Sequence, residues 1–124
     1  IDANFIVIWG GLDENFLANE IKNLCPNIHI SDKLNLEELM LLIKQVDLVI
    51  GPDTGPTHMA WALNIPSITL YGPTPGYRNS CLTEINKIIE SDSEVNPVKI
   101  NYNDFSINNL KVSEIVKIAD KLLL

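Results

Sequence analysis

Residues 47–75 restrict the fold of this chain more than any other segment. They begin with a short, largely β-branched apolar run at residues 48–50, which is typical of a strand buried in a parallel sheet. Turn-forming residues 51–55 follow at once, and Pro56 suits the first turn of a helix. A second apolar run at residues 67–71 comes next. The segment therefore predicts a strand, a tight turn, a helix and a second strand in succession.

A helix that begins directly after a parallel strand places its amino end above the carboxyl edge of the sheet. The first N–H groups of such a helix attract anions, by about 0.3–1 kcal/mol at an exposed helix end. Pro56 has no N–H, so other groups of this turn must donate. We expect these donors to be the backbone amides of Gly55, Thr57 and His58, with the side chains of Thr54, Thr57 and His58. The alternative is a capped helix end that binds nothing, and the turn alone leaves both open.

The rest of the chain alternates in the same way. Apolar patterns predict further strands at residues 5–9, 27–30 and 87–90, and helices at residues 13–24, 35–44, 56–63 and 112–123. Asn35 with Glu38 three residues later indicates a capping box. Residues 72–79 and 92–109 are rich in turn formers and predict loops. We therefore expect residues 1–124 to form one α/β domain, a three-layer Rossmann-like parallel sheet with helices on both faces.

Size and charge limit the class of protein. A chain of 124 residues is one ordinary domain, and its net charge of −7 leaves no basic stripe for nucleic acid. The two cysteines, Cys25 and Cys81, lack metal-type spacing, and free thiols are the simplest interpretation. No apolar run is long enough to span a membrane and no signal peptide is visible. Because the chain begins with Ile1 instead of Met, we expect a piece of a longer protein.

Further candidate residues follow the predicted strands, where α/β sheets bind ligands. Gly10 and Gly11 allow either a close backbone approach to a ligand or a simple turn. Glu14 would accept hydrogen bonds from a ribose or pair with the helix dipole. Leu34 suits either contact with a base or the core, and Arg78 would reach an anion or stay solvated.

Metal chemistry has little support in the sequence. The segment Asp92-Ser93-Glu94 is similar to acidic pairs that hold a divalent metal in some sugar transferases, but it lacks a third nearby ligand and a solvated turn is favoured. His29 lies in a predicted strand and is interpreted as structural. No Ser-His-Asp pattern, Walker A loop or GxGxxG fingerprint is present. We therefore predict neither a metal site nor a cofactor.

The stretch that begins at Asp53 resembles the bacterial heptosyltransferases, glycosyltransferase family nine. Their segments Asp-Thr-Gly-x-x-His-x-Ala, Ala-Leu-x-x-Pro and Phe/Tyr-Gly-Pro-Thr are matched in order and spacing by Asp53-Thr54-Gly55-Pro56-Thr57-His58-Met59-Ala60, Ala62-Leu63-Asn64-Ile65-Pro66 and Tyr71-Gly72-Pro73-Thr74. Trp9-Gly10 followed by Glu14 is similar to the family's Trp-Gly motif and its acidic residue. The pattern is most similar to the members that add the first heptose to the Kdo of lipid A–Kdo.

The resemblance implies the C-terminal half of a two-domain GT-B enzyme, which binds the donor ADP-heptose. The residues implied to contact the diphosphate and sugar are Asp53, Thr54, Gly55 and His58, with Glu14 at the ribose and Leu34 at the adenine. The acceptor surface and the general base would belong to the N-terminal domain, so this chain alone is expected to be inactive. The implied reaction inverts the anomeric centre without a metal. The implied location is the cytoplasm of a Gram-negative bacterium, or the inner face of its inner membrane.

Two other interpretations stay open. One is a GT-B or epimerase-like enzyme that uses a UDP- or GDP-sugar, because the same fold and phosphate contacts would serve. The other is a non-catalytic Rossmann-like interaction module. A receiver domain of that kind needs an acidic cluster after the first strand, where this chain has Trp9-Gly10-Gly11.

Overall fold

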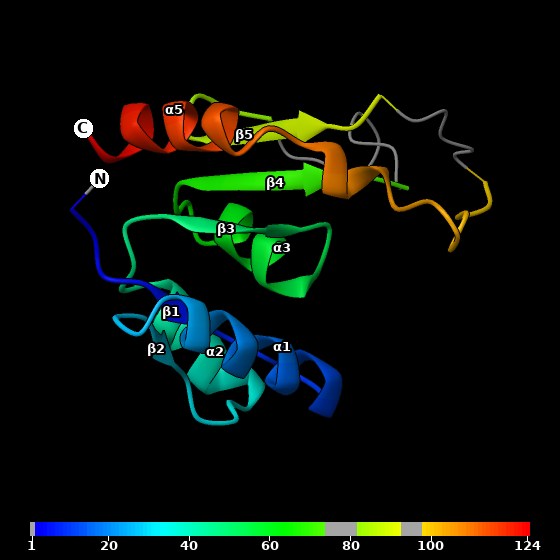
Figure 1. The fold of residues 1–124 in the computed structure, drawn as a ribbon. Coiled ribbons are helices and arrows are strands. Elements are labelled where there is room, and N and C mark those ends of the chain that lie inside the picture. Colours follow the sequence, from blue (N-terminus) through cyan, green and yellow to red (C-terminus); the bar gives the residue numbers. More distant parts are fainter. Residues whose placement is uncertain (1, 74–81, 93–97) are drawn as a thin grey trace. The chain divides into compact units, whose positions relative to one another are not determined.

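A computed structural model of the chain describes residues 2–73, 82–92 and 98–124 (Figure 1). The elements in these ranges are β1 (Ile6–Val7), α1 (Leu12–Leu24), β2 (His29–Ile30), α2 (Leu36–Ile43), β3 (Val49–Pro52), α3 (Gly55–Ala62), β4 (Ser67–Tyr71), β5 (Asn86–Glu90), the 3-10 helix η1 (Ser106–Asn109) and α5 (Val112–Leu123). Every predicted strand and helix is present, and the bounds differ by at most two residues. Thr74, Arg78, Cys81, Ser93 and Glu94 lie outside the described residues.

The chain divides into two compact units, Ile1–Met40 and Leu41–Leu124, with the boundary inside α2. In the first unit β1 and β2 pair in parallel, with Ile6 opposite His29. The predicted capping box at the start of α2 is confirmed: Asn35 N–H donates to Glu38 Oε2 at 2.8 Å, and Glu38 N–H donates to Asn35 Oδ1 at 2.9 Å.

The second unit contains a parallel sheet in the order β3-β4-β5. Side chains alternate between the faces of a strand, so neighbouring residues of β4 contact different helices. Ser67 accepts a hydrogen bond from Trp61 of α3, whereas Ile68 packs with Ala119 of α5. The helices α3 and α5 therefore cover opposite faces, and the predicted α/β class with a parallel sheet is confirmed.

The two faces of β4 differ in chemistry. The α5 face holds the apolar core, in which Ile68, Ile89 and Ala119 are buried. Leu48, Leu70, Leu110, Ile115, Ile118 and Leu122 pack against them. Burial of a large aliphatic side chain contributes about 1.5–3 kcal/mol. The α3 face of the strand instead carries three buried hydroxyl groups, those of Ser67, Thr69 and Tyr71. The site described below is built on this polar face.

The helix η1 lies in a segment that the sequence predicts to be irregular. Its first turn forms because Asp104 Oδ1 accepts a hydrogen bond from Ser106 N–H at 2.8 Å, a side-chain turn without helical periodicity in the sequence. Ser106 Oγ lies 2.7 Å from Ser91 Oγ, which anchors η1 to the end of β5. The helix also packs on the chain after β4, because a Cβ atom on Gly72 would lie 2.9 Å from Ile107 Cβ.

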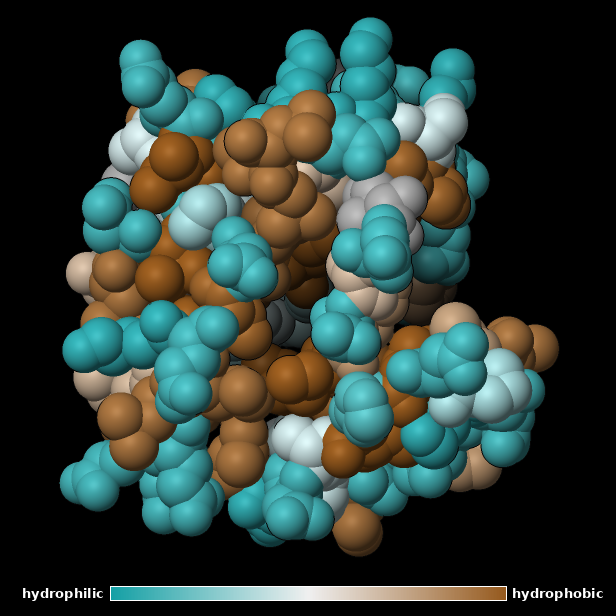
Figure 2. Space-filling view, turned by 90° about the vertical axis from the view of Figure 1, so that its left-hand side faces the viewer, coloured by the Kyte–Doolittle hydropathy of each residue, from teal (hydrophilic) through white to brown (hydrophobic). Residues whose placement is uncertain are grey.

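Exposed apolar side chains occur in both units, and the brown atoms in Figure 2 show such side chains at the surface. Examples are Phe16 and Leu17 on α1 in the first unit, and Phe105 and Val112 in the second. None of the helices in the described ranges has the length and apolar character needed to cross a membrane.

Candidate functional site

The turn between β3 and α3 is the centre of the candidate site. Thr54 is the N-cap of α3 and has extended backbone angles, φ −142° and ψ 173°. Gly55 is the first residue of the helix and Pro56 the second, as the Thr-Gly-Pro order predicts. Because β3 pairs in parallel with β4, the amino end of α3 lies at the carboxyl edge of the sheet.

Thr57 holds this turn together from inside. Its side chain is buried, and its hydroxyl oxygen lies 2.9 Å from the carbonyl oxygen of Pro52 and 2.8 Å from that of Thr54. The same oxygen accepts a hydrogen bond from the N–H of Thr54 at 3.3 Å. The sequence predicts that Thr57 donates to a ligand, whereas the structure shows its hydroxyl bonded within the turn.

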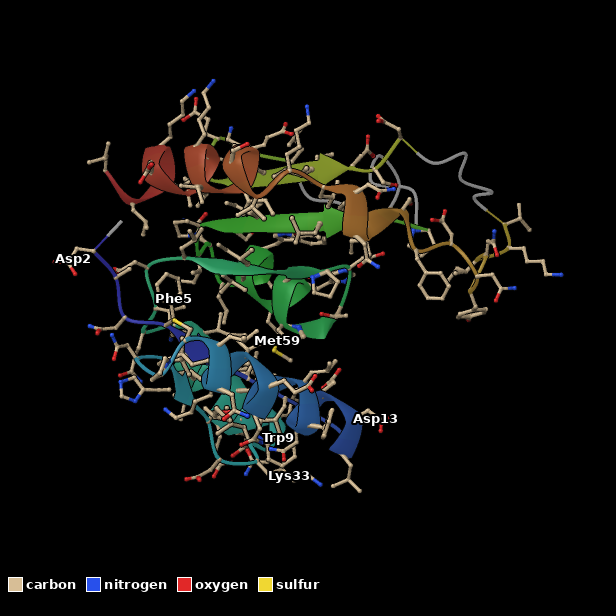
Figure 3. The ribbon with its side chains drawn as sticks, in the orientation of Figure 1. Asp2, Phe5, Trp9, Asp13, Lys33 and Met59 are labelled. Carbon is tan, nitrogen blue, oxygen red and sulfur yellow. The ribbon has the colours of Figure 1, made fainter. Side chains whose placement is uncertain are left out.

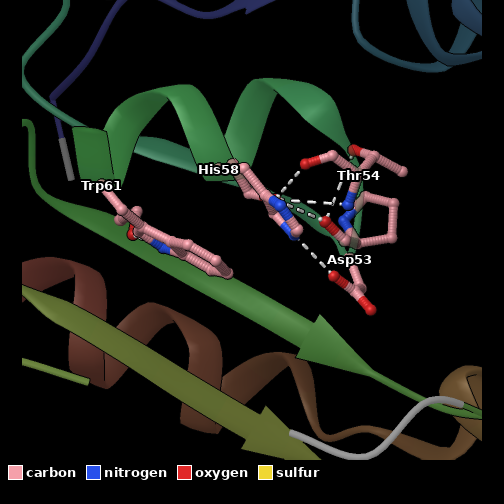
Figure 4. Close-up of polar contacts among 7 residues, drawn as sticks. Asp53, Thr54, His58 and Trp61 are labelled. Carbon is pink, nitrogen blue, oxygen red and sulfur yellow. Dashed lines mark hydrogen bonds and ion pairs between the residues drawn. The ribbon is translucent and has the colours of Figure 1, made fainter. Parts of the chain in front are cut away.

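Asp53 and His58 form a pair at the open side of the turn (Figure 4). The Nε2 atom of His58 lies 2.7 Å from Oδ1 of Asp53, with the His58 side chain 48% exposed and that of Asp53 11% exposed. The backbone N–H of His58 donates to the carbonyl of Thr54 at 3.2 Å. That amide therefore belongs to the helix, and His58 offers its ring to the site. Gly55 and Thr57 keep the amides that helix geometry leaves without an intrahelical acceptor.

Trp61 lies on the same side of α3 as His58. The ring centroids are 4.4 Å apart and the ring planes are inclined by 21°, so the two rings are stacked. Residues three apart on a helix are neighbours on its surface. The spacing of His58 and Trp61 in the sequence could therefore have indicated that their rings are in contact. The sequence interpretation nevertheless gave Trp61 no role.

Tyr71 is a second residue that sequence reasoning missed. Pro52 of β3 pairs with Leu70 of β4, so the next residues along, Asp53 and Tyr71, are neighbours across the ladder. The Tyr71 hydroxyl is buried and has no hydrogen-bond partner within the described residues. Burial raises the pKa of Tyr71 well above its usual value, and the negative charges of Asp53 and Glu90 raise it further. The phenol therefore stays neutral near pH 7.

Three predicted residues of the first unit, Gly10, Gly11 and Glu14, are joined by hydrogen bonds. Glu14 Oε2 accepts hydrogen bonds from the backbone N–H of Gly10 at 2.5 Å and of Gly11 at 3.4 Å. This carboxylate thus caps the start of α1. Trp9, labelled in Figure 3, donates from Nε1 to the carbonyl of Ser31 at 2.9 Å, which ties the end of β1 to the loop that contains the half-buried Leu34.

Asp92 is the part of the predicted acidic segment that the structure describes. It lines an open cavity beyond β5 together with Glu90, Ser91, Ser106, Asn109, Leu110, Lys111 and Glu114. Across the described residues, no group of three or more His, Cys, Asp or Glu side chains could hold a metal ion. Cys25 is an exposed free thiol.

A parallel sheet with a polar turn at the amino end of a crossing helix defines a Rossmann-like α/β protein. The glycosyl transferase family 9 structure from Veillonella parvula DSM 2008 has the same fold, with a TM-score of 0.79 and 18% identity over 97% of this chain and 36% of that chain. The family model for glycosyltransferase family 9 (heptosyltransferase) matches residues 2–104. The chain therefore belongs to glycosyltransferase family 9.

Several curated relatives are named as lipopolysaccharide heptosyltransferases. Lipopolysaccharide heptosyltransferase 1 of Campylobacter coli is 44% identical over 119 residues, which are 92% of this chain and 35% of the relative. Lipopolysaccharide heptosyltransferase 1 of Salmonella typhimurium is 35% identical over 69 residues, 55% of this chain and 22% of the relative. Lipopolysaccharide heptosyltransferase 3 of Escherichia coli is 39% identical over 74 residues, 56% of this chain and 22% of the relative. The chain thus spans about a third or less of the length of these relatives.

Proposed function

We propose that this chain is the donor-binding part of a heptosyltransferase, which transfers heptose from ADP-heptose to the Kdo-containing inner core of lipopolysaccharide. The observation that carries the proposal is the Asp53–His58 pair at the amino end of α3, within the segment that resembles the family signature. The names of the relatives support transfer to lipopolysaccharide.

The turn offers suitable contacts for a diphosphate. The amides of Gly55 and Thr57 and the hydroxyl of the exposed Thr54 lie at the positive end of the helix dipole. The imidazole of His58 adds a ring nitrogen beside them, since its other nitrogen is bonded to Asp53. The carboxylate of Asp53 is bonded to His58 Nε2 at 2.7 Å, so its role would be to hold the imidazole beside the donor.

The first unit would hold the nucleoside. The bonds of Glu14 Oε2 to the backbone of Gly10 and Gly11 orient the carboxylate and leave Oε1 as an acceptor for a ribose hydroxyl. Leu34 is half-buried and would contact the adenine with its remaining surface. The two glycines permit close approach of this backbone.

The reaction would be a direct displacement with inversion. A hydroxyl group of the acceptor attacks C1 of the heptose, the bond from C1 to the diphosphate breaks, and ADP leaves with the bonding electrons. Negative charge grows on the diphosphate, where the amino end of α3 and the His58 ring would stabilise it. The general base would come from the N-terminal domain, so this chain alone would not transfer sugar. A lipid-anchored acceptor would place the enzyme at the inner face of the inner membrane.

Calorimetric titration of the chain with ADP, UDP and GDP tests the proposal. We expect ADP to bind most tightly. His58→Ala should weaken this binding, and His29→Ala, which changes the other of the two histidines, is its matched control. Tighter binding of UDP or GDP would favour an enzyme with a different sugar donor. Absence of any nucleotide-induced shift in the amide NMR signals would favour a non-catalytic module.

A further inference from the structure

The stacked indole of Trp61 is held in place by a buried polar network. Its Nε1–H donates to Ser67 Oγ at 3.1 Å. Ser67 also accepts a hydrogen bond from Asn86 Nδ2 at 2.9 Å, and the same Nδ2 group donates to the carbonyl of Ile65 at 2.9 Å. Ser67 and Asn86 are both buried. A satisfied network of this kind is rigid, so it anchors the indole nitrogen to β4 and β5.

The imidazole of His58 has the opposite environment. Its side chain is 48% exposed, and within the described part of the chain its ring has one side-chain hydrogen bond, from Nε2 to Asp53 Oδ1 at 2.7 Å. A single hydrogen bond at one ring edge leaves the ring free to tilt about that bond. Trp61 contacts the ring through its face, with 4.4 Å between the centroids. The imidazole thus has an edge contact with Asp53, drawn as a dashed line in Figure 4, and a face contact with Trp61.

We propose that Trp61 is a positioning residue for His58: its indole, anchored through Ser67 to Asn86, holds the imidazole in the orientation that contacts the diphosphate of the donor. The contact with the diphosphate rests on the proposed function, whereas the orientation of the ring does not. Trp61 acts through His58 and makes no contact with the ligand itself.

The ligand-free test is NMR of the His58 ring. An indole stacked on the imidazole shifts the ring protons of His58 upfield through its ring current, and His29 serves as an internal reference in the same spectrum. We expect Trp61→Leu to abolish this upfield shift and Trp61→Phe to keep part of it, because phenylalanine retains an aromatic face. An unchanged His58 spectrum in Trp61→Leu would overturn the proposal.

The ligand-bound test is a double-mutant cycle with ADP. We expect Trp61→Leu to weaken ADP binding about tenfold, and Trp61→Phe to weaken it by about threefold or less. In a His58→Ala background, Trp61→Leu should change affinity by less than about twofold, because the ring it positions is gone. Equal losses in both backgrounds would show that Trp61 acts on the fold as a whole, and would overturn the proposal.

Two further results keep the test decisive. If Trp61→Leu does not fold, Ser67→Ala replaces it: the variant removes the acceptor of the indole N–H, and we expect a loss of about threefold in ADP affinity that vanishes in the His58→Ala background. If the unmodified protein does not bind ADP but Trp61→Leu abolishes the His58 ring shift, the proposed function fails while the role of Trp61 in orienting His58 stands.

Discussion

The Nε2 atom of His58 lies 2.7 Å from Oδ1 of Asp53, at the point where β3 turns into α3. The two residues are five positions apart, and the pair closes the turn on its solvent side. Thr57 closes the same turn on its buried side through the carbonyl of Pro52. The turn therefore has an exposed half available for a ligand and a buried half that maintains its shape.

His58→Ala should weaken ADP binding about tenfold, since it removes a side-chain contact with a charged diphosphate. The melting temperature should fall by only a few degrees, because the side chain is 48% exposed and the lost stacking with Trp61 is worth about 0.5–1.5 kcal/mol. Calorimetry measures the affinity and thermal unfolding the stability, with His29→Ala as control. A large loss of stability at unchanged affinity would instead make His58 a structural residue.

Thr57→Val should lower the free energy of unfolding by about 1–3 kcal/mol, because the turn loses a buried hydroxyl group that is bonded to it. Thr69→Val is the matched control, since Thr69 is equally buried but its hydroxyl has no partner within the described residues. That substitution should be neutral or stabilising. Urea unfolding of both variants measures the difference, and equal losses would contradict the assignment of Thr57 to the turn.

Tyr71→Phe should make the protein more resistant to alkali. The folded-state pKa of Tyr71 is raised, by burial first and by Asp53 and Glu90 next, so the unfolded chain releases the phenolic proton at lower pH than the folded one. The contribution of Tyr71 to stability is complete below about pH 10 and decreases as the pH rises above that value.

Urea midpoints measured from pH 8 to pH 11 test this prediction. The wild-type midpoint should fall more steeply above pH 10 than that of Tyr71→Phe. Tyr102→Phe should follow the wild type, because Tyr102 is exposed. Identical slopes for the wild type and Tyr71→Phe would show that the phenol titrates freely in the folded protein.

Gly72→Ala should destabilise the second unit by about 1–3 kcal/mol through overpacking. The added Cβ atom would lie 2.9 Å from Ile107 Cβ and 3.3 Å from Ile107 N, so η1 would have to move away from β4. Gly55→Ala is the comparison, because a Cβ atom there meets nothing within 4 Å. Chemical unfolding that gave equal stabilities for the two variants would contradict the packing of Ile107 on Gly72.

Local sequence patterns predicted much of the second unit. The β-branched run of β3, the Thr-Gly-Pro order of the turn and the breaker Pro66 all act through near neighbours, and all three elements from β3 to β4 are present. The fold class followed from these patterns, and the family followed from the resemblance of residues 53–74 to its signature segments. The use of Asp53, Thr54, Gly55, Thr57, His58, Gly10, Gly11, Glu14 and Leu34 by a ligand stays a prediction.

The remaining features depend on contacts between distant residues. The hydrogen-bonded network that anchors Trp61 includes Asn86, which is 19 positions from Ser67 in the sequence. The proximity of Asp53 to Tyr71 depends on the register in which β3 pairs with β4. The inward rotation of the Thr57 hydroxyl depends on carbonyl positions in the turn. Neither residue spacing nor composition carries this information.

The row of Ser67, Thr69 and Tyr71 gives β4 a polar face beneath α3, whereas α5 rests on aliphatic side chains. Aliphatic contacts are non-directional and tolerate small shifts, but a hydrogen bond such as that from Trp61 to Ser67 is lost when its atoms move by about an ångström. The helix that carries His58 is therefore tied to β4 by a directional bond, whereas the opposite helix is held by aliphatic packing. Exchange of one aliphatic residue for another should be accepted on the α5 side of the sheet, and variation should be restricted on the α3 side.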